Sequence, residues 1–285
     1  MLTLNCHSLQ GFDTKQQITE LVDQIVREKV TVFALQEANQ PQDTPIIKSE
    51  TLNQVNYIKP KEEQSKPIRE GNFAYLLQCA LCKVKLNFSW SWCAAHQLLG
   101  KYDEGLALFS LSPLYQVSAE KIDIHPDITA GTRVHKILSG KLHNAEETLL
   151  VTTHLDGQTT QRFTLEWDCF YRKLKYLGAL HLPTYILANF NVDAEEDRHG
   201  YEYMCRELQD TYVTAISKGD GMTVRGQLDG WGKKELARRI DYILTNANHE
   251  VTSSRICFDG YESQKISDHA GVIIEVEMDK TSQPA

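Results

Sequence analysis

The stretch Y-I-L-A-N-F-N-V-D, residues 185–193, joins an apolar run to two amides. Residues 185–187 have the continuous apolar character of a strand that is buried on both faces. Asn189 and Asn191 follow with a single residue between them. In α/β sheets, ligand sites collect at the ends of strands, so this stretch indicates a buried strand that delivers polar side chains to a site.

Other short runs along the chain have the length and β-branched composition of buried strands. They are L-T-L-N (2–5), V-T-V-F-A-L-Q (30–36), L-A-L-F-S (106–110), T-L-L-V-T-T-H (148–154), R-I-D-Y-I-L (239–244) and G-V-I-I-E-V (271–276), in addition to T-Y-I-L-A-N (184–189), which overlaps the first stretch. Apolar residues at helical spacing predict helices over 14–29, 163–177 and 201–208. Strands and helices that alternate evenly favour a single α/β domain, which we place at residues 1–278, with a flexible tail at 279–285.

Composition narrows the class of protein. The chain has 285 residues, 24% of them charged and 41% hydrophobic, as in ordinary soluble globular proteins. Its net charge of −8 argues against a protein that neutralises duplex phosphates, although a local basic groove is compatible with an acidic total. No secretory leader or membrane-spanning run is recognisable, and the seven cysteines suit reduced thiols. We therefore expect a cytoplasmic protein without a membrane partner.

Polar residues end or adjoin most of the predicted strands. They are Asn5, Gln36, Glu37, His154, Asn189, Asn191, Asp241, Asp268 and His269. One such residue alone is more often a turn cap or a solvated group than a ligand. The number of them at strand ends favours a shared site.

The types of these residues indicate a particular chemistry. Carboxylate and amide oxygens without cysteine suit a hard cation such as Mg²⁺ or Mn²⁺. Histidines beside carboxylates suit proton transfer and charge stabilisation near neutral pH. Together they are typical of phosphate-ester hydrolysis. The phosphate-binding loop of nucleotide-binding proteins, the serine-hydrolase elbow and the dinucleotide-binding glycine motif are absent from the sequence.

Six short motifs occur in an order that resembles the endonuclease/exonuclease/phosphatase (DNase I-like) superfamily. They are N-C-H (5–7), L-Q-E (35–37), T-H-L (153–155), A-N-F-N (188–191), R-I-D-Y-I (239–243) and S-D-H (267–269). Each tripeptide alone is a weak signal, but the ordered set spans nearly the whole chain. The resemblance implies a four-layer α/β sandwich, in which two packed mixed β-sheets are flanked by helices and the site lies at one rim.

The resemblance also implies roles for individual residues. Glu37 is expected to be the principal metal ligand, with Asn5 and Asp268 close to the metal. His154 is expected to contact the phosphate and to be oriented by Glu104. The roles implied for the remaining residues are a hydrogen-bonded pair made by Asp241 and His269, and a contact with the phosphate or the attacking water made by Asn191.

Further segments are similar to a cytoplasmic Gram-positive branch of the superfamily that includes maltose-6'-phosphate phosphatase. They are S-W-S-W (89–92), K-Y-D-E-G-L-A-L-F-S (101–110) and Q-L-D-G-W (227–231). They supply aromatics that suit a sugar face: Trp90, Trp92, Tyr102 and Trp231. Core packing is the favoured alternative for Trp90 and an equal alternative for Trp231. Lys101 and Arg133 are candidate phosphate contacts, and a solvated surface role is the alternative for each.

Asn189 departs from the family pattern, which has Asp in this place. An amide accepts a hydrogen bond from the attacking water but cannot take its proton. Three explanations stay open: a slow enzyme with another base, a relative that binds ligand without catalysis, or an altered residue.

The leading functional hypothesis is a Mg²⁺- or Mn²⁺-dependent phosphatase that acts on a small phosphorylated metabolite, with a sugar phosphate as the first candidate. The runner-up is a nuclease or another phosphodiesterase, including a sphingomyelinase-like enzyme. It needs a continuous basic groove or a membrane-insertion segment, and the charge balance argues against nucleic acid as partner. A ligand-binding relative without catalysis is the third class.

Overall fold

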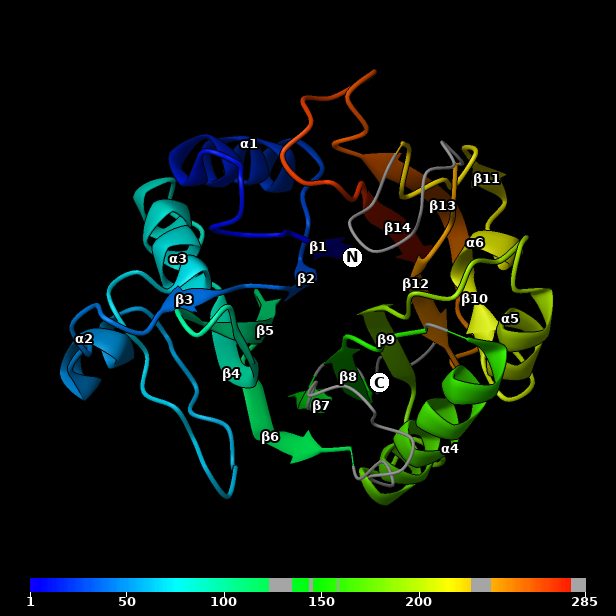
Figure 1. Cartoon of the computed structure of the whole chain (residues 1–285), viewed down its shortest axis with the longest axis horizontal. Coiled ribbons are helices and arrows are strands. Elements are labelled where there is room, and N and C mark those ends of the chain that lie inside the picture. Colours follow the sequence, from blue (N-terminus) through cyan, green and yellow to red (C-terminus); the bar gives the residue numbers. More distant parts are fainter. Residues whose placement is uncertain (123–134, 144–145, 158, 227–236, 278–285) are drawn as a thin grey trace, which may run out of the picture.

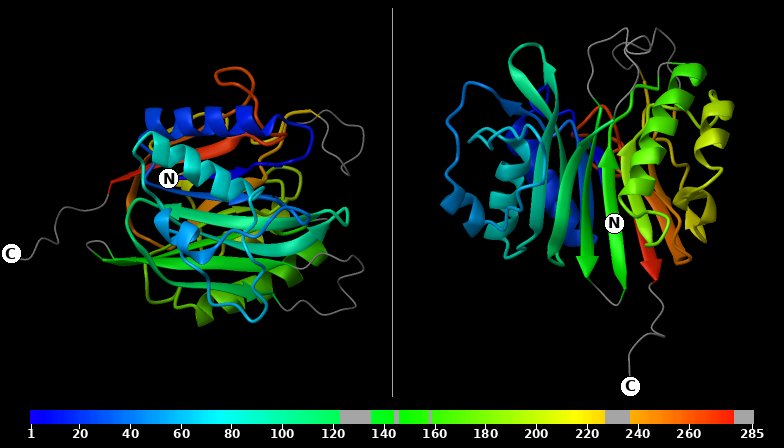
Figure 2. Two further views of the ribbon diagram at one scale, coloured as in Figure 1. Left: turned by 90° about the vertical axis from the view of Figure 1, so that its left-hand side faces the viewer. Right: turned by 90° about the horizontal axis from the view of Figure 1, so that it is seen from below.

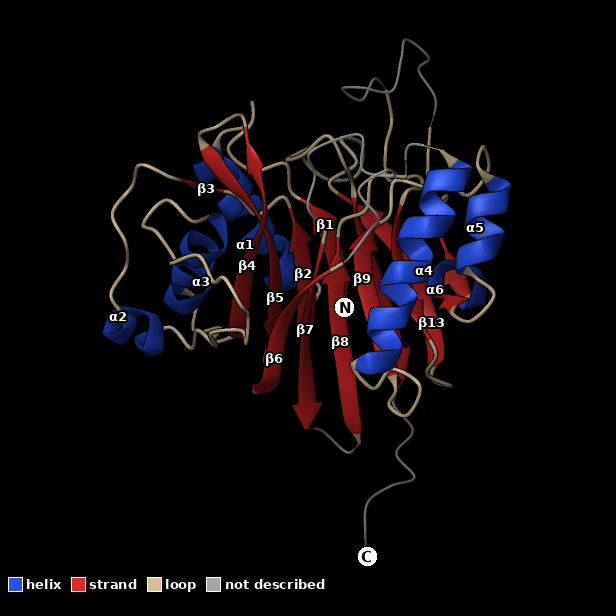
Figure 3. Cartoon of the chain, turned by 60° about the horizontal axis from the view of Figure 1, so that its bottom comes forward, coloured by secondary structure: helices blue, strands red, loops and turns tan. Residues whose placement is uncertain are grey.

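Two β-sheets pack face to face, and helices cover both outer faces (Figure 1 and Figure 2). The computed structural model describes residues 1–122, 135–143, 146–157, 159–226 and 237–277. This is the four-layer sandwich that the sequence predicts. Figure 3 shows the strands of both sheets running between the two groups of helices.

The first sheet contains eight strands within the described residues. Their order is β11-β13-β14-β1-β2-β5-β3, and β4 pairs with β5. The strands are β1 (Leu2–Asn5), β2 (Val32–Gln36), β3 (Gln40–Pro41), β4 (Ser89–Leu98), β5 (Tyr102–Ser110), β11 (Ser217–Lys218), β13 (Glu250–Cys257) and β14 (Gly271–Glu277). The central strand β1 is parallel to β2 and antiparallel to β14.

The second sheet contains six strands in the part of the chain that the structure describes. Their order is β10-β12-β9-β8-β7-β6. The strands are β6 (Leu114–Lys121), β7 (Lys136–His143), β8 (Glu147–Thr153), β9 (Thr184–Asn189), β10 (Gln209–Asp210) and β12 (Asp241–Thr245). The parallel pair β8–β9 lies at its centre, and β12 runs antiparallel to β9.

Six helices connect the strands in the described residues. They are α1 (Thr14–Arg27), α2 (Ser49–Gln54), α3 (Phe73–Lys83), α4 (Thr160–Tyr176), α5 (Arg198–Met204) and α6 (Thr211–Thr214). The long helices begin at capped positions: Asp13 accepts a hydrogen bond from the backbone N–H of Gln16, and Thr159 accepts one from Arg162. Among the described helices, none is long and apolar enough to cross a membrane.

Three apolar layers hold the sandwich together. One joins α1 and α3 to the outer face of the first sheet, and Trp90 is fully buried in it. The middle layer lies between the sheets, and the third joins α4 to the second sheet around Phe170 and Phe190. Because each sheet is covered on both faces, its central strands are apolar throughout, which is why they stand out in the sequence.

The sequence-based boundaries hold well for the buried strands and less well elsewhere. The strands predicted at 2–5 and 184–189 have the observed bounds. The helix predicted over 201–208 begins three residues earlier, where Asp197 caps it, and ends four residues earlier, at Met204. Strands β6 and β13 escape prediction, since exposed and half-buried positions interrupt their apolar pattern. Strand β7 escapes it because Ser139 and Gly140 interrupt its buried run. The predicted tail lies outside the described residues.

Candidate active site

Strand direction brings the predicted site residues to one rim of the sandwich. Strands β1, β2 and β9 end at this rim, and there they present Asn5, Glu37 and Asn189. Asp241 begins β12 instead of ending a strand, but β12 is antiparallel to β9 and pairs Asp241 directly with Asn189. Asp268 likewise precedes β14, which is antiparallel to β1.

The first sheet supplies a cluster of oxygen ligands. The Asn5 amide Nδ2 donates to Oε1 of Glu37 at 2.9 Å. The Asn5 Oδ1 accepts from the backbone N–H of His7 at 3.1 Å. Glu37 adopts a left-handed backbone conformation, with φ of 51°, which costs a non-glycine residue about 1 kcal/mol.

His7 lies between the two carboxylates of this cluster. Its Nδ1 is 3.1 Å from Oε2 of Glu37 and 3.7 Å from Oδ1 of Asp268. Burial lowers the pKa of His7, but the hydrogen bond to Glu37 and the charge of Asp268 outweigh burial and raise it. Burial raises the pKa of Glu37, and His7 and His154 hold it well below its usual range. Sequence reasoning gave His7 no role, although it is the histidine of the N-C-H motif.

A hard cation fits this donor set. Two carboxylates and one amide oxygen are the ligand types that Mg²⁺ and Mn²⁺ prefer, and cysteine does not contribute to the set. The low pKa of Glu37 keeps its carboxylate ionised at neutral pH, as metal binding requires. The imidazole of His7 lies between the carboxylates of Glu37 and Asp268, so these two carboxylates favour a positive charge at this position.

The second sheet places His154 across the rim. Its Nδ1 lies 3.3 Å from Oε1 of Glu104 and 4.0 Å from Oε1 of Glu37. On its other side, Nε2 lies 3.1 Å from Nδ2 of Asn191. Because Nδ2 also donates to the Leu155 carbonyl at 2.8 Å, the contacts fit a tautomer with the proton on Nδ1.

Asp241 and His269 form the expected pair. Oδ2 of Asp241 lies 2.8 Å from Nδ1 of His269, and both residues are buried. Burial lowers the pKa of His269, but the charge of Asp241 outweighs burial and raises it to about 9. The imidazole is therefore positively charged at neutral pH, which suits stabilisation of phosphoryl oxygens.

The two amides of the A-N-F-N motif lie in different environments. Asn189 is fully buried; its Nδ2 donates to the Ile240 carbonyl at 3.3 Å, and its Oδ1 has no hydrogen-bond partner within the described residues. Asn191 has a φ of 55° and points its amide at His154. Gly157 permits this arrangement, because a Cβ there would lie 2.2 Å from the Asn191 carbonyl oxygen.

Of the four predicted substrate-binding residues, the structure describes two. Lys101 and Tyr102 lie at the tip of the β4–β5 hairpin, with Lys101 exposed and Tyr102 half-buried. Trp90 and Trp92 are buried, and each donates its indole N–H to a backbone carbonyl, so the S-W-S-W segment is part of the core. Arg133 and Trp231 lie outside the described residues.

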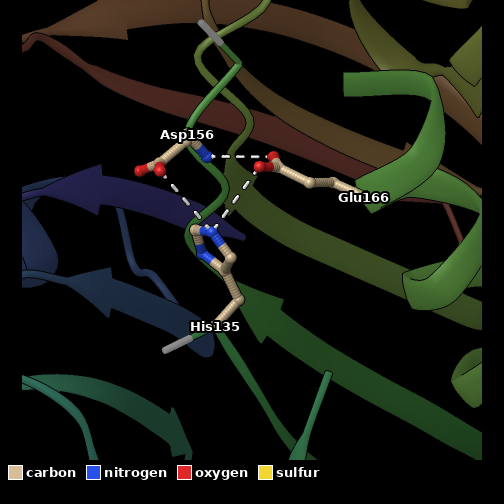
Figure 4. A group of neighbouring side chains, drawn as sticks. All are labelled: His135, Asp156 and Glu166. Atoms are coloured by element: carbon tan, nitrogen blue, oxygen red, sulfur yellow. Dashed lines mark hydrogen bonds and ion pairs between the residues drawn. The ribbon is translucent and has the colours of Figure 1, made fainter. Parts of the chain in front are cut away.

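His135, Asp156 and Glu166 form an ionic cluster (Figure 4), and His135 contacts the backbone of His154. Nδ1 of His135 lies 2.9 Å from the His154 carbonyl oxygen, and its Nε2 lies 3.8 Å from Asp156 and 3.7 Å from Glu166. These three residues have the geometry of a possible metal site. The guanidinium of Arg162, however, contacts both carboxylates at 2.8 and 2.9 Å and already supplies positive charge to them.

This cluster holds the segment that carries His154. Glu166 accepts a hydrogen bond from the backbone N–H of Asp156 at 3.3 Å, while His135 contacts the carbonyl of His154. Burial raises the pKa of Glu166, and the hydrogen bond from Arg162 opposes that effect. Sequence reasoning missed the cluster. Its one visible signal is the four-residue spacing of Arg162 and Glu166, but the helix predicted over 163–177 begins one residue after Arg162.

We expect the loss of Arg162 to destabilise the fold. Arg162→Met leaves two buried carboxylates without their cation, and we expect the free energy of unfolding to fall by about 3–5 kcal/mol. Arg198→Met is the matched control, since it breaks an exposed arginine–glutamate pair of the same spacing on α5. Urea unfolding at pH 7 measures both changes. Equal midpoints for the two variants would contradict the assigned role of the buried cluster.

Comparison with known proteins agrees with this geometry. The sequence profile described as "Endonuclease/Exonuclease/phosphatase family" matches residues 2–269. The chain belongs to this family. Members of the endonuclease/exonuclease/phosphatase family are phosphoesterase hydrolases. A search of curated proteins found no match.

Solved structures show that the fold is shared with other members of the endonuclease/exonuclease/phosphatase family. A family protein from Leptotrichia buccalis C-1013-b has 23% sequence identity and a TM-score of 0.79, with 97% of this chain and 98% of that chain covered. The mannosyl-6-phosphatase from Bacteroides thetaiotaomicron VPI-5482 has 17% identity, a TM-score of 0.64 and coverage of 97% and 98%. Truncated TDP2 from Caenorhabditis elegans has 12% identity, a TM-score of 0.59 and 96% coverage of both chains.

Proposed function

We propose that the protein is a Mg²⁺- or Mn²⁺-dependent phosphatase that releases phosphate from a small phosphorylated metabolite, with a sugar phosphate as its substrate. The observation that carries the proposal is the approach of the two halves of the site. Nδ1 of His154 lies 4.0 Å from Oε1 of Glu37, so the oxygen-ligand cluster and the histidine half share one space. A phosphoryl group held there contacts both a metal position and imidazole groups.

In this proposal, Glu37, Asp268 and Asn5 hold the cation. When bound, the cation supplies Lewis-acid polarisation of the phosphoryl oxygens. His154, held by Glu104 and Asn191, lines the position of the phosphoryl group, and the charged His269 offsets the negative charge of that group. Water adds to phosphorus while the phosphorus–oxygen bond to the alcohol breaks, and the alcohol leaves with a proton that comes from that water.

The narrower assignment, to sugar phosphates, rests on two further points. The motifs at 89–92, 101–110 and 227–231 resemble the Gram-positive branch that includes maltose-6'-phosphate phosphatase. One structural relative carries the name mannosyl-6-phosphatase, which supports a hexose phosphate as the first substrate to test. The net charge of −8 argues against a nucleic acid as partner, since a duplex brings dense negative charge.

A second candidate is a relative that binds ligand but turns over slowly or not at all. It is favoured by Asn189, because an amide in this place takes no proton from water. The buried, unpartnered Oδ1 of Asn189 still accepts a hydrogen bond from a water that reaches it. The two candidates therefore differ in turnover and agree in ligand binding.

A substrate panel tests the proposal. Purified protein with Mg²⁺ or Mn²⁺ receives hexose phosphates, the diester bis(p-nitrophenyl) phosphate and supercoiled plasmid. We expect metal-dependent release of inorganic phosphate from the monoesters and an intact plasmid. Plasmid nicking without phosphate release would replace the phosphatase with a nuclease. Tight binding of hexose phosphate without release would favour the second candidate.

A further inference from the structure

The side chain of Gln36 lies in the middle layer between the two sheets, just below the rim. Gln36 is the last residue of β2, immediately before Glu37, and it is fully buried. Side chains two residues apart on a strand share a face, and Val32 and Ala34 pack in the middle layer. The amide of Gln36 therefore points from the first sheet toward the second, at a depth that substrate does not reach.

The amide of Gln36 forms hydrogen bonds with both sheets. Its Nε2 lies 2.9 Å from Oγ1 of Thr152 and 3.1 Å from the carbonyl oxygen of Leu187, which both belong to the second sheet. In the first sheet, Oγ1 of Thr3 lies 3.1 Å from Nε2 and 3.4 Å from Oε1. An amide nitrogen carries two hydrogens, so all four groups are satisfied when Nε2 donates to Thr152 and Leu187 while Thr3 donates to Oε1. We call this set of contacts the Gln36 bridge.

The Gln36 bridge lies one step below the candidate site on every strand that it joins. Its three partners each precede a site residue by two positions: Thr3 before Asn5 on β1, Thr152 before His154 at the end of β8, and Leu187 before Asn189 on β9. His154 continues the ladder of β8, because it forms a parallel bridge with Asn189. The bridge therefore connects the supports of the metal cluster to the supports of the histidine half.

The separation of the two halves matters for the proposed chemistry. Oε1 of Glu37, on the first sheet, lies 4.0 Å from Nδ1 of His154, on the second. A phosphoryl group that reaches a cation and an imidazole together depends on this spacing, and a misplacement of about 1 Å can cost about 100-fold in rate. Because the polar groups of the bridge are buried, the sheets cannot shift here without leaving these groups unpaired.

We propose that Gln36 is a positioning residue, whose amide holds the metal half of the site at a fixed distance from the histidine half. The inference rests on the proposed phosphatase function and assigns a role to a group that touches neither cation nor substrate. Glu37 has anchors of its own in the first sheet, since the Ser8 hydroxyl donates to its carbonyl at 2.7 Å and the next residue, Ala38, donates to the Gly105 carbonyl at 2.9 Å. Loss of the amide is therefore expected to leave the cation ligands in place and to change the spacing of the halves.

Gln36→Met removes the amide and keeps an unbranched side chain of similar length. Gln78→Met is the matched control, since Gln78 is also fully buried but lies on α3, where its Nε2 donates to the carbonyls of Val55 and Phe88 at 3.0 and 2.8 Å. We expect both variants to lower the urea midpoint, and Gln36→Met alone to lower kcat for glucose 6-phosphate with Mg²⁺, by about 10- to 100-fold. Equal kcat values for the two folded variants would overturn the inference.

Phosphate binding separates positioning from a general loss of stability. Calorimetry with inorganic phosphate, with and without Mn²⁺, measures how strongly the cation tightens phosphate binding. We expect tightening of about tenfold or more in the unaltered protein and in Gln78→Met, and of about twofold or less in Gln36→Met. The affinity of Gln36→Met for Mn²⁺ alone is expected to stay within about twofold of the unaltered protein, because the ligands remain in place.

The outcomes of this measurement distinguish the inference from the proposed function. Unchanged tightening in Gln36→Met would overturn the role of Gln36 and leave the phosphatase proposal standing. Absence of both tightening and phosphate release in the unaltered protein would overturn the proposed function, and the role of Gln36 with it.

Thr152 provides a second pair of variants that disturb the Gln36 bridge less. Thr152→Val leaves one amide hydrogen of Gln36 without an acceptor, whereas Thr152→Ser keeps the hydroxyl. We expect Thr152→Val to lower kcat by about tenfold, and Thr152→Ser to stay within about twofold of the unaltered protein. Equal kcat values in Thr152→Val and Thr152→Ser would contradict a positioning role for the bridge.

Discussion

Asn189→Asp is expected to raise phosphatase turnover by about 10- to 1,000-fold, the range of general acid–base contributions. The carboxylate would stand in the ladder directly opposite Asp241, in a buried position. Burial and a neighbouring like charge both raise a carboxyl pKa, which brings the new acid closer to the pH at which it acts as a base. Initial rates of phosphate release as a function of pH measure the effect.

The same change has a structural cost that serves as an internal check. Nδ2 of Asn189 donates to the Ile240 carbonyl, and a carboxylate oxygen there cannot. We expect stability to fall by about 1–3 kcal/mol while activity rises, the signature of a residue that serves the chemistry.

Asn191→Asp is the matched control for that variant. It makes the same amide-to-acid change two residues along, but removes the donor to His154 and to the Leu155 carbonyl. We expect it to lower activity. Unchanged turnover in Asn189→Asp would mean that another group already takes the proton. A rise in both variants would mean that added negative charge, not position 189, limits the rate.

Glu37→Ala is expected to abolish metal-dependent activity, with a loss of about 1,000-fold or more. A metal contributes several kcal/mol to charge stabilisation, and each tenfold in rate corresponds to about 1.4 kcal/mol. Glu37 is the centre of the ligand cluster, because Asn5, His7 and Gln10 all contact its carboxylate. Mn²⁺ binding measured by calorimetry is expected to weaken in parallel, which separates loss of metal from loss of substrate.

The exposed Glu50→Ala on α2 is the control for loss of a carboxylate. Circular dichroism and urea unfolding show whether Glu37→Ala remains folded. Full activity in a folded Glu37→Ala protein would remove Glu37 from the site and leave the ligand cluster without its central residue.

The apolar runs predict an α/β domain because its central strands are buried on both faces, whereas the four-layer sandwich is predicted by the resemblance to the family. Their apolar runs are long enough to stand out, and the polar residues that follow them mark the rim. The weaker elements include the edge strand β6, whose buried positions are interrupted by exposed and half-buried ones, and β7, whose buried run contains Ser139 and Gly140. Their positions depend on partners distant in the chain, which no local pattern contains.

The residues of the candidate site were also predicted only in part from the sequence. The residues of the six motifs gather at one rim, as their order in the family implies. His7 and the His135–Arg162 cluster escape prediction, because their importance comes from contacts between segments far apart in sequence. The S-W-S-W segment follows the core-packing alternative that the sequence favours for Trp90, because β4 places both indoles in the core.

The central claim, that this rim hydrolyses phosphate monoesters with a bound cation, is tested most directly by one paired measurement. Unaltered protein is incubated with glucose 6-phosphate in Mg²⁺ and, separately, in excess EDTA, and inorganic phosphate is followed over time. We predict steady release in Mg²⁺ and release at least about 100-fold slower in EDTA. Equal release in the two reactions would contradict the metal site built on Glu37, Asp268 and Asn5.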